Sequence, residues 1–408
     1  MRQFFDNISA DFKAKVYPNQ AEFGRQIAHK FLDRNIVSIL AIAPTQSGKT
    51  GSMLAIIQHM LYLPLLSMPL NHIFIITGHS STEWLQQTKE RFPEELHDRI
   101  FHRNTLNSFA EHIKGIQSAL IIIDENQIAS SDGQAIHKAF EEANIDNLDS
   151  LYKNDIKIVQ FSATPLNVNL FNNPHSRICY MIPPPSYVSI QRLMLHGRVK
   201  QYKDLCGKHP KHSAVSWKIR SSFIPPPQDI KDNINEITSF FSESPQYHII
   251  RTPPSYQHDV VISNFIQTLG NQFKYFSDID IDDINDLLII KPKTHSFIFI
   301  KERLRCAKTI HKQFLGVLYE RVSSVVQDHV IVQGLAGRLT GYHSNSNAVV
   351  FTNILSIRRY LHDFKNQFQD AKTNPKAFIY KPRATTTTGL RPRTTLEDNT
   401  TEDRAILQ

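Results

Sequence analysis

The sequence predicts an α/β protein with two tandem parallel-sheet domains, followed by a disordered C-terminal tail. Three observations lead to this prediction. The length of 408 residues exceeds one ordinary core, continuous apolar runs alternate with helical patterns, and this alternation occurs twice. The hydrophobic content of 41% supplies enough apolar surface for packed interiors.

Four apolar runs between residues 36 and 165 predict the strands of the first sheet. They read IVSILAIA, HIFIIT, ALIIID and IKIVQFSA. Continuous rather than alternating hydrophobicity suits strands that are covered on both faces, and the separations leave room for crossover helices. A helix after the first run is predicted from apolar residues at helical spacing, namely Met53, Ile56, Ile57, Met60 and Leu61.

The second α/β pattern comprises the runs YHIIRT, DLLIIKP, SFIFIK and NAVVFTN, which we expect to be strands. A final helix is predicted with one buried face made by Ile354, Ile357, Leu361, Phe364 and Phe368.

Two proline triplets, at 183–185 and 225–227, mark the boundaries between these patterns. We therefore predict domains at 1–180 and 246–370, with a linker or inserted subdomain at 181–245. Residues 371–408 are Thr-rich and nearly free of large apolar groups, which predicts a disordered tail.

The composition favours an intracellular, soluble protein. There are 46 Lys and Arg residues against 38 Asp and Glu, a formal net charge of +8, which favours a polyanionic partner. A solvated basic surface without a partner is the alternative. Cys179, Cys206 and Cys306 are scattered, which argues against a secreted disulfide framework. No apolar run reaches about 18 residues, so we expect no membrane span. The segment CGKHPKH around Cys206 matches no standard zinc spacing, so no zinc site is predicted.

The stretch APTQSGKT, residues 43–50, lies between the first apolar run and the first predicted helix. Its spacing is that of a phosphate-binding loop. Such a loop turns backbone N–H groups toward the phosphates, while Lys49 reaches the β- and γ-phosphates and the Thr50 hydroxyl holds Mg²⁺. We expect ATP and Mg²⁺ to bind here. The residues expected at the nucleotide are Ala43, Thr45, Gln46, Ser47, Gly48, Lys49, Thr50 and Gly51.

Two adjacent acids, Asp124 and Glu125, follow the apolar run ALIII. Parallel sheets bind ligands at the carboxyl ends of their strands. Asp124 is therefore predicted to hold the magnesium ion, and Glu125 to polarise the attacking water. A solvated turn is the alternative interpretation, which the phosphate loop upstream makes less favourable.

In this order, APTQSGKT, DENQ and FSATP resemble motifs I, II and III of superfamily 2 helicases. The resemblance implies two RecA-like domains, with ATP and magnesium in the cleft and nucleic acid across the top. It also implies that Gln127 and the hydroxyls of Ser162 and Thr164 couple the nucleotide state to the nucleic-acid groove. Gln20, in YPNQ, resembles the adenine-reading glutamine of the family, and a surface residue is an equal alternative.

The stretch ITGHSS resembles motif Ia of this family, which touches the nucleic-acid backbone. The resemblance implies phosphate contacts by Thr77, His79 and Ser80. Arg103 and Asn104 are further candidates for the same track. A helix cap accounts equally well for the hydroxyl residues that begin at Ser80.

Two stretches of the second half also resemble the family. SFIFIKERLRCAKTI resembles motif IV, and its basic residues Lys301, Arg303 and Arg305 are groove candidates or a solvated helix face. The stretch 331–342, IVQGLAGRLTGY, resembles motif VI. This implies that Arg338 stabilises charge on the transferring phosphoryl group, with Gln333 near the γ-phosphate or its water.

The motif VI stretch departs from the family pattern Q/H-R-x-G-R-x-x-R. Gly341 stands where a second arginine is usual, and no motif V is recognisable between residues 305 and 330. The form QGLAGRLTGY resembles a divergent branch found in large DNA viruses and phages. The expected locations are therefore the cytoplasm, the nucleus, a viral replication site or the virion.

Two functions remain open from the sequence. Intact motifs I to III favour an ATP-dependent helicase or translocase, with DNA preferred over RNA as the partner. The reduced motif VI and absent motif V favour an ATP-gated nucleic-acid-binding switch or remodelling subunit without processive unwinding. We expect a monomer with no membrane partner.

Overall fold

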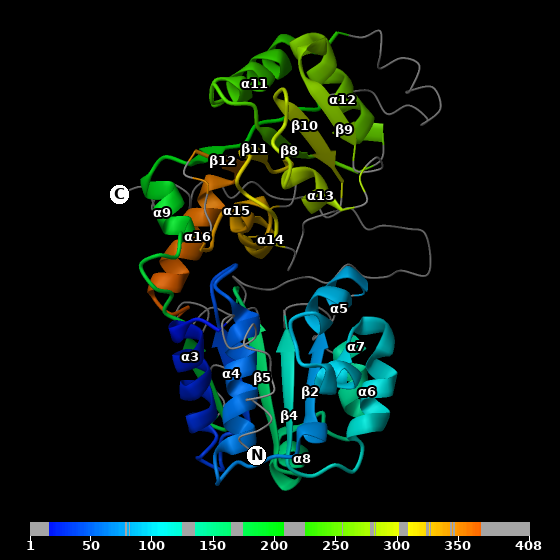
Figure 1. Cartoon of the computed structure of the whole chain (residues 1–408), viewed down its shortest axis with the longest axis vertical. Coiled ribbons are helices and arrows are strands. Elements are labelled where there is room, and N and C mark those ends of the chain that lie inside the picture. The colour runs from blue at the N-terminus through cyan, green and yellow to red at the C-terminus, as the bar shows by residue number, and fades with distance from the viewer. Residues whose placement is uncertain are drawn as a thin grey trace, which may run out of the picture.

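The computed structural model describes residues 16–77, 80, 82–124, 135–164, 174–207, 225–254, 256–277, 281, 283–301, 309–323, 326, 328–342, 345 and 347–368. It shows two lobes, each built on a six-stranded sheet (Figure 1). Neighbouring strands pair in parallel throughout both sheets. The predicted fold class is thus confirmed for the part of the chain that is described, and the predicted tail at 371–408 lies outside it.

The first lobe has the strand order β3-β2-β4-β5-β1-β6. The register pairs Thr77 with Asp124 and Ile42 with Ser162, so the segments that follow these strands leave the same sheet edge. The four predicted runs form β1, β2, β4 and β5, whereas β3 and β6 were not predicted. The strands are β1 (Ser38–Ile42), β2 (Ile73–Thr77), β3 (Ile100–Phe101), β4 (Ala119–Asp124), β5 (Ile156–Ser162) and β6 (Ser176–Tyr180).

Helices cover both faces of this sheet, which explains the continuous hydrophobicity of its strands. Alternate residues of β4 enter different cores: Leu120 and Ile122 share a core with α3 and α4, and Ile121 and Ile123 share one with α6 and α7. Figure 1 shows these two helix pairs on opposite sides of the strands. The helices are α3 (Pro18–Lys30), α4 (Lys49–Tyr62), α5 (Thr82–Lys89), α6 (Leu106–Ile113), α7 (Ala135–Glu142) and α8 (Leu148–Lys153).

The second lobe has the strand order β7-β12-β11-β8-β10-β9. The predicted runs YHIIRT, SFIFIK and NAVVFTN form β8, β10 and β12, and the predicted final helix forms α16. Its elements are β7 (Val199–Gln201), α11 (Gln228–Thr238), β8 (Tyr247–Arg251), α12 (Tyr256–Leu269), β9 (Lys274–Ser277), α13 (Ile284–Leu288), β10 (Ser296–Ile300), β11 (Leu315–Tyr319), α14 (Asp328–Gln333), α15 (Leu335–Arg338), β12 (Val349–Thr352) and α16 (Ile354–Lys365).

The run DLLIIKP is not a strand, so that prediction was wrong. Asp283 caps a helix by accepting a hydrogen bond from the Asn285 backbone N–H at 2.8 Å, and α13 follows. Ile284 and Leu288, four residues apart, are buried, whereas Ile289 is 61% exposed. One buried stripe at helical spacing, opened by a capping aspartate, favours a helix over a two-sided strand. The second sheet instead contains β11, a strand that the sequence analysis did not predict.

The described part of the segment 181–245 extends the second lobe. β7 pairs in parallel with β12, and α9 (Ile190–Leu195) comes before β7 in the chain. Three isoleucines of α11 enter the same core as β8, β10 and β11, namely Ile230, Ile234 and Ile237.

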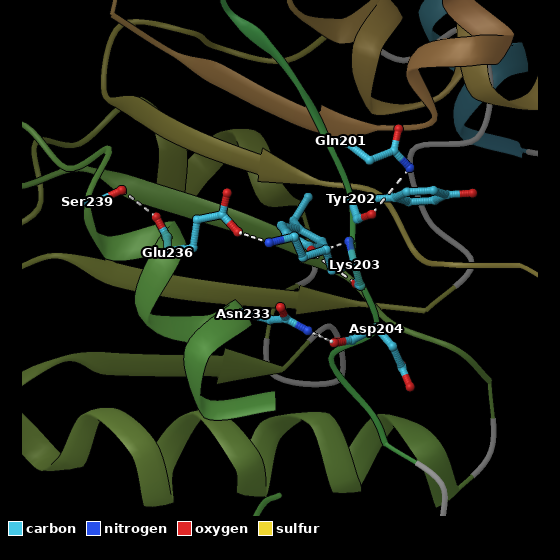
Figure 2. A network of polar contacts seen from close by, with 8 residues as sticks. Gln201, Tyr202, Lys203, Asp204, Asn233, Glu236 and Ser239 are labelled. Atoms are coloured by element: carbon cyan, nitrogen blue, oxygen red, sulfur yellow. Dashed lines mark hydrogen bonds and ion pairs between the residues drawn. The ribbon is translucent and has the colours of Figure 1, made fainter. Parts of the chain in front are cut away.

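Polar contacts fasten β7 and the residues after it to α11 (Figure 2). The Lys203 ammonium lies 2.8 Å from a Glu236 carboxylate oxygen, and the Asn233 amide donates to the Asp204 carbonyl at 2.9 Å. The Tyr319 hydroxyl donates to the Lys203 carbonyl at 2.8 Å. These contacts join β7, α11 and the central strand β11 into one unit.

Close packing of α3 against α4 gives a first prediction. A Cβ at Gly24 would lie 2.5 Å from the Ala55 Cβ and 2.9 Å from the Ile56 backbone nitrogen. Gly24→Val should therefore lower the free energy of unfolding by about 1–3 kcal/mol through overpacking, measured by chemical denaturation followed by circular dichroism. Ala21→Val, on the exposed face of the same helix, is the matched control. Equal effects of the two substitutions would contradict the close approach of these helices.

Candidate functional site

The phosphate loop is shaped by two residues with left-handed backbone. Gln46 has φ 55° and Gly48 has φ 93°, and α4 begins directly afterwards at Lys49. The Ser47 hydroxyl donates to the Pro44 carbonyl at 2.7 Å, and the Ala43 N–H donates to the Ser162 carbonyl at 3.0 Å. The loop is thereby fixed at the sheet edge with the N-terminus of a 14-residue helix at its end. Such a terminus presents unpaired N–H groups that bind anions.

Gln20 lies against the phosphate loop rather than on the surface, since it is only 2% exposed. Its amide donates to the Ser47 carbonyl at 3.3 Å, and its oxygen accepts from the Tyr17 N–H at 3.1 Å. A Cβ at Gly48 would lie 1.8 Å from the Gln20 amide nitrogen, and one at Gly51 would lie 2.0 Å from its oxygen. Both glycines are therefore needed to admit this glutamine, and the surface alternative for Gln20 was wrong.

Lys49 and Asp124 meet at the carboxyl edge of the first sheet. The Lys49 ammonium lies 3.8 Å from an Asp124 carboxylate oxygen, and the side chains are 15% and 14% exposed. The Thr77 hydroxyl donates to the Asp124 carbonyl at 3.1 Å and so ties β2 to the end of β4. Thr50 lines the same cavity as these two charged groups. A carboxylate and a hydroxyl are oxygen ligands of the kind that Mg²⁺ prefers.

A cavity of about 1180 Å³ separates the phosphate loop from the second lobe. Its described charged side chains are four cations and one carboxylate, which makes it suited to an anionic ligand. They are Lys49, Arg91, Lys312, Arg338 and Asp124. The volume is just above the range of about 300–1,000 Å³ usual for small-molecule sites, so a nucleotide fits with room to spare.

Hydroxyl groups from residues that follow the first sheet in the chain hold the phosphate loop by its carbonyls. Thr340 donates to the Thr45 carbonyl at 2.8 Å, and Tyr187 donates to the same carbonyl at 2.6 Å. Tyr342 donates to the Ser47 carbonyl at 2.9 Å, and its ring stacks on Tyr17 with centroids 4.7 Å apart. The resemblance to motif VI covered Thr340 and Tyr342 but assigned them no role. Tyr187 lies in PPPSYV, which gave no signal.

The two predicted residues of the motif VI stretch reach the interface between the lobes. The Gln333 amide donates to the Thr164 hydroxyl at 3.0 Å. Arg338 is 4% exposed and lines the cavity. The structure thus brings Lys49, Asp124, Gln333 and Arg338 to one cavity.

A buried ion pair that the sequence analysis missed positions the motif VI stretch. The Arg251 guanidinium lies 2.6 Å from a Glu320 oxygen, and the two side chains are 2% and 3% exposed. The same oxygen accepts from the Leu335 N–H at 3.3 Å, at the start of α15. A Cβ at Gly334 would lie 2.7 Å from it. The available signal was a charged residue at the end of each apolar run, YHIIR and LGVLYE.

The candidate nucleic-acid contacts divide into three groups. Thr77 is fully buried, and its hydroxyl donates to the Asp124 carbonyl at 3.1 Å. Ser80, Arg103 and Asn104 are exposed and follow the carboxyl ends of β2 and β3. His79, Arg303 and Arg305 lie outside the described residues, and Lys301 is half-buried. Glu125, predicted to polarise the attacking water, and Gln127, predicted to couple the two sites, also lie outside them.

Ser162 and Thr164 are buried, and Ser162 serves the local turn. Its hydroxyl donates to the Thr164 carbonyl at 2.8 Å and accepts from the Thr164 N–H at 3.0 Å. The Thr164 hydroxyl is left to accept from Gln333 across the lobes.

The two described cysteines lie in different cores, Cys179 in the first lobe and Cys206 in the second. Burial raises the pKa of the Cys179 thiol to about 11 and that of Cys206 to about 12. Among the described residues, no group of three His, Cys, Asp or Glu side chains is placed to hold a metal ion. In the same part of the chain, no helix combines the length and apolar character needed to cross a membrane.

Comparison with known proteins identifies one sequence relative and solved structures with a similar fold. No protein-family profile matches the chain. An uncharacterized protein of Acanthamoeba polyphaga mimivirus is 26% identical over 376 residues, which are 85% of this chain and 88% of that protein. The ATP-dependent Type ISP restriction-modification enzyme LlaBIII bound to DNA aligns with TM-score 0.52 and 13% identity over 82% of this chain and 27% of its own. The DEAH/RHA helicase HrpB of Escherichia coli aligns with TM-score 0.45 and 13% identity over 82% of this chain and 43% of its own. The chain therefore spans less than half of either enzyme, and the likeness to LlaBIII shows a shared fold.

The glycines around Gln20 give a second prediction. Gly51→Ala should lower stability by about 1–3 kcal/mol because its Cβ displaces a buried, hydrogen-bonded side chain. In the Gln20→Ala background, Gly51→Ala should cost much less, because the side chain that its Cβ displaces is absent. Gly48→Ala should remain impaired in the Gln20→Ala background, because its φ of 93° disfavours any side chain. Thermal unfolding of the three single variants and the two double variants distinguishes these cases. A small cost of both glycine substitutions in the Gln20→Ala background would refute the assigned backbone strain.

The buried ion pair gives a third prediction. Arg251→Met leaves the Glu320 carboxylate buried without its cation, which should cost about 3–5 kcal/mol of stability. Arg359→Met breaks an exposed pair with Asp328, whose side chains are 43% and 37% exposed, and should cost at most about 1 kcal/mol. Urea denaturation of both variants makes the comparison. Similar losses would show that the Arg251 pair does not hold the second lobe as described.

Proposed function

We propose that this chain is an ATP-dependent nucleic-acid motor of the superfamily 2 helicase kind. It hydrolyses ATP and couples the hydrolysis to movement along nucleic acid or to strand separation, with DNA preferred over RNA. The observation that carries this proposal is the position of residues 333–342. This stretch of the second lobe contacts the phosphate loop of the first lobe beside a cavity rich in cations.

ATP binding is assigned to the phosphate loop and the start of α4. The Gln46 amide nitrogen is buried and makes no hydrogen bond within the described part of the chain, although a buried donor normally has a partner. A phosphate oxygen in the cavity would supply that partner. Lys49 would contact the β- and γ-phosphates. Gln20 would support the loop through its hydrogen bond to the Ser47 carbonyl.

Thr50 and Asp124 would hold Mg²⁺, as their oxygen chemistry fits this ion. The ion, when bound, would neutralise charge on the phosphates. Glu125 is the proposed general base for the attacking water. Arg338 would stabilise the charge that develops on the transferring phosphoryl group, from a position that is buried and therefore poorly screened by solvent.

Coupling between nucleotide and nucleic acid would use the Gln333–Thr164 hydrogen bond, with Gln127 as a further proposed member. Thr164 follows β5, and exposed Ser80, Arg103 and Asn104 follow strands of the same sheet edge. A change in the position of the second lobe would therefore reach the edge where nucleic acid is proposed to bind. The fold shared with an ATP-dependent enzyme bound to DNA supports DNA as the partner.

An ATP-gated binding switch without processive unwinding is the second candidate. It is favoured by Gly341, which provides no second arginine in the motif VI stretch. ATP-dependent change in DNA affinity without unwinding of a partial duplex would select this candidate. Unwinding or displacement of a bound protein block would select the motor.

The central prediction concerns hydrolysis of ATP with single-stranded DNA, duplex DNA or RNA. One of these polymers should stimulate the rate of ATP hydrolysis, and Lys49→Ala should abolish hydrolysis. Arg338→Ala should lower kcat on the order of 10³-fold, the loss expected for an arginine finger. Release of inorganic phosphate is the measurement, and Arg192→Ala, at an exposed residue of the second lobe, is the control.

Hydrolysis that no nucleic acid changes would contradict the motor. Hydrolysis that survives Lys49→Ala would place the reaction elsewhere or in a contaminant.

A further inference from the structure

Gly341 leaves a space in the cavity wall that is occupied by a lysine from another part of the chain. The backbone of Gly341 has φ 113°, which disfavours a side chain. The position that a Cβ would take lies 3.2 Å from the Lys312 ammonium and 3.3 Å from the Gln46 side-chain oxygen. The place where an arginine side chain would begin in the family pattern thus holds a different cation beside the phosphate loop.

Lys312 is fixed in this place by contacts at both ends. Its carbonyl accepts from the Leu315 N–H at 3.1 Å and from the Asn345 amide at 3.2 Å, at the entry to β11. Its ammonium donates to the Thr340 carbonyl. The residue is 8% exposed and lines the same cavity as Lys49 and Arg338.

The surroundings of Lys312 favour an incoming anion. Burial, then Arg338 and Arg198, lower the pKa of the Lys312 ammonium to about 8. The other charged or titratable groups among the described residues of the cavity wall are Lys49, Arg91, Asp124, His311, Tyr17 and Tyr342. A buried cation near two further cations is disfavoured until a negative charge compensates it. The unbonded amide nitrogen of Gln46 beside it independently points to an acceptor in the same space.

We propose that Lys312 contacts the terminal phosphate of the bound nucleotide and supplies the second cation that residue 341 does not. This proposal rests on the proposed function, because it assigns a residue to the same nucleotide site. Lys312 would act together with Arg338, which lines the same cavity. It would distinguish a nucleoside triphosphate from a diphosphate, since only the former carries the phosphate that it contacts.

The protonation of Lys312 gives this role a pH signature. The free protein loses the ammonium charge as pH rises through about 8, so kcat/KM for ATP should fall above that pH. A bound phosphate favours the charged form, so ATP binding at pH 8.5 should be accompanied by proton uptake. Lys312→Arg keeps its charge throughout this range and should remove both effects.

The experiment compares wild type, Lys312→Met, Lys312→Arg and Lys293→Met, an exposed lysine of the same lobe. Calorimetry at pH 7 measures binding of ATP and ADP in the presence of Mg²⁺. Lys312→Met should weaken ATP binding roughly 10- to 100-fold, the range for one charged hydrogen bond, and should change ADP binding little. Lys312→Arg should retain most of the ATP affinity, and Lys293→Met should match wild type. Thermal midpoints of all four report whether the fold is retained.

Equal weakening of ATP and ADP by Lys312→Met, or an unchanged preference for ATP, would overturn this role. The same holds if kcat/KM of wild type and Lys312→Arg depend on pH alike. In both cases, wild-type hydrolysis that Lys49→Ala abolishes would leave the proposed function standing. Loss of the ATP preference in Lys312→Met, with wild-type hydrolysis unresponsive to nucleic acid, would instead support the site and contradict the motor.

Discussion

The carbonyl groups of the phosphate loop are held by hydrogen bonds from outside the loop, and the arrangement of the whole site depends on this. Thr45 and Ser47 present carbonyls to Thr340, Tyr187, Tyr342 and Gln20. Each peptide unit carries its donor opposite its acceptor, so fixing the carbonyls on one side aims N–H groups at the other. The loop therefore faces the cavity with donors, next to the N-terminus of α4.

Holding the loop from the second lobe requires very close approach of two backbones. A Cβ at Gly337 would lie 3.1 Å from the Thr45 side chain and 2.5 Å from the Val332 carbonyl. At Gly341, the side chains of Lys312 and Gln46 lie where a side chain of residue 341 would begin. Gly337 and Gly341 are thus explained by contact with the phosphate loop, whereas Gly334 is explained by the approach of Glu320. The Arg251–Glu320 pair then fixes where α15 begins.

The sequence allowed prediction of those features that local pattern determines. β1, β2, β4 and β5 were predictable because burial on two faces demands uninterrupted apolar residues, and Lys49, Asp124 and Arg338 because motif spacing identifies them. Lys312 and the Arg251–Glu320 pair were not predictable, because the strand order brings β8 beside β11 and the 309–312 segment beside residue 341. DLLIIKP was misassigned because a short apolar run does not reveal whether one face or two are buried.

The contacts between the lobes differ in kind, and this difference determines how a nucleotide could control them. Thr340, Tyr342 and Gln333 make hydrogen bonds between neutral groups, each worth about 0.5–1.5 kcal/mol net. Lys312 and Arg338 present buried charges to the cavity, and each hydrogen bond from a charged group contributes about 1.5–3 kcal/mol. The neutral contacts can therefore align the lobes whatever the cavity contains. Under the proposed function, the charged side chains would favour closure only when negative charge compensates their burial, and loss of the terminal phosphate would weaken closure through Lys312 and Arg338 first.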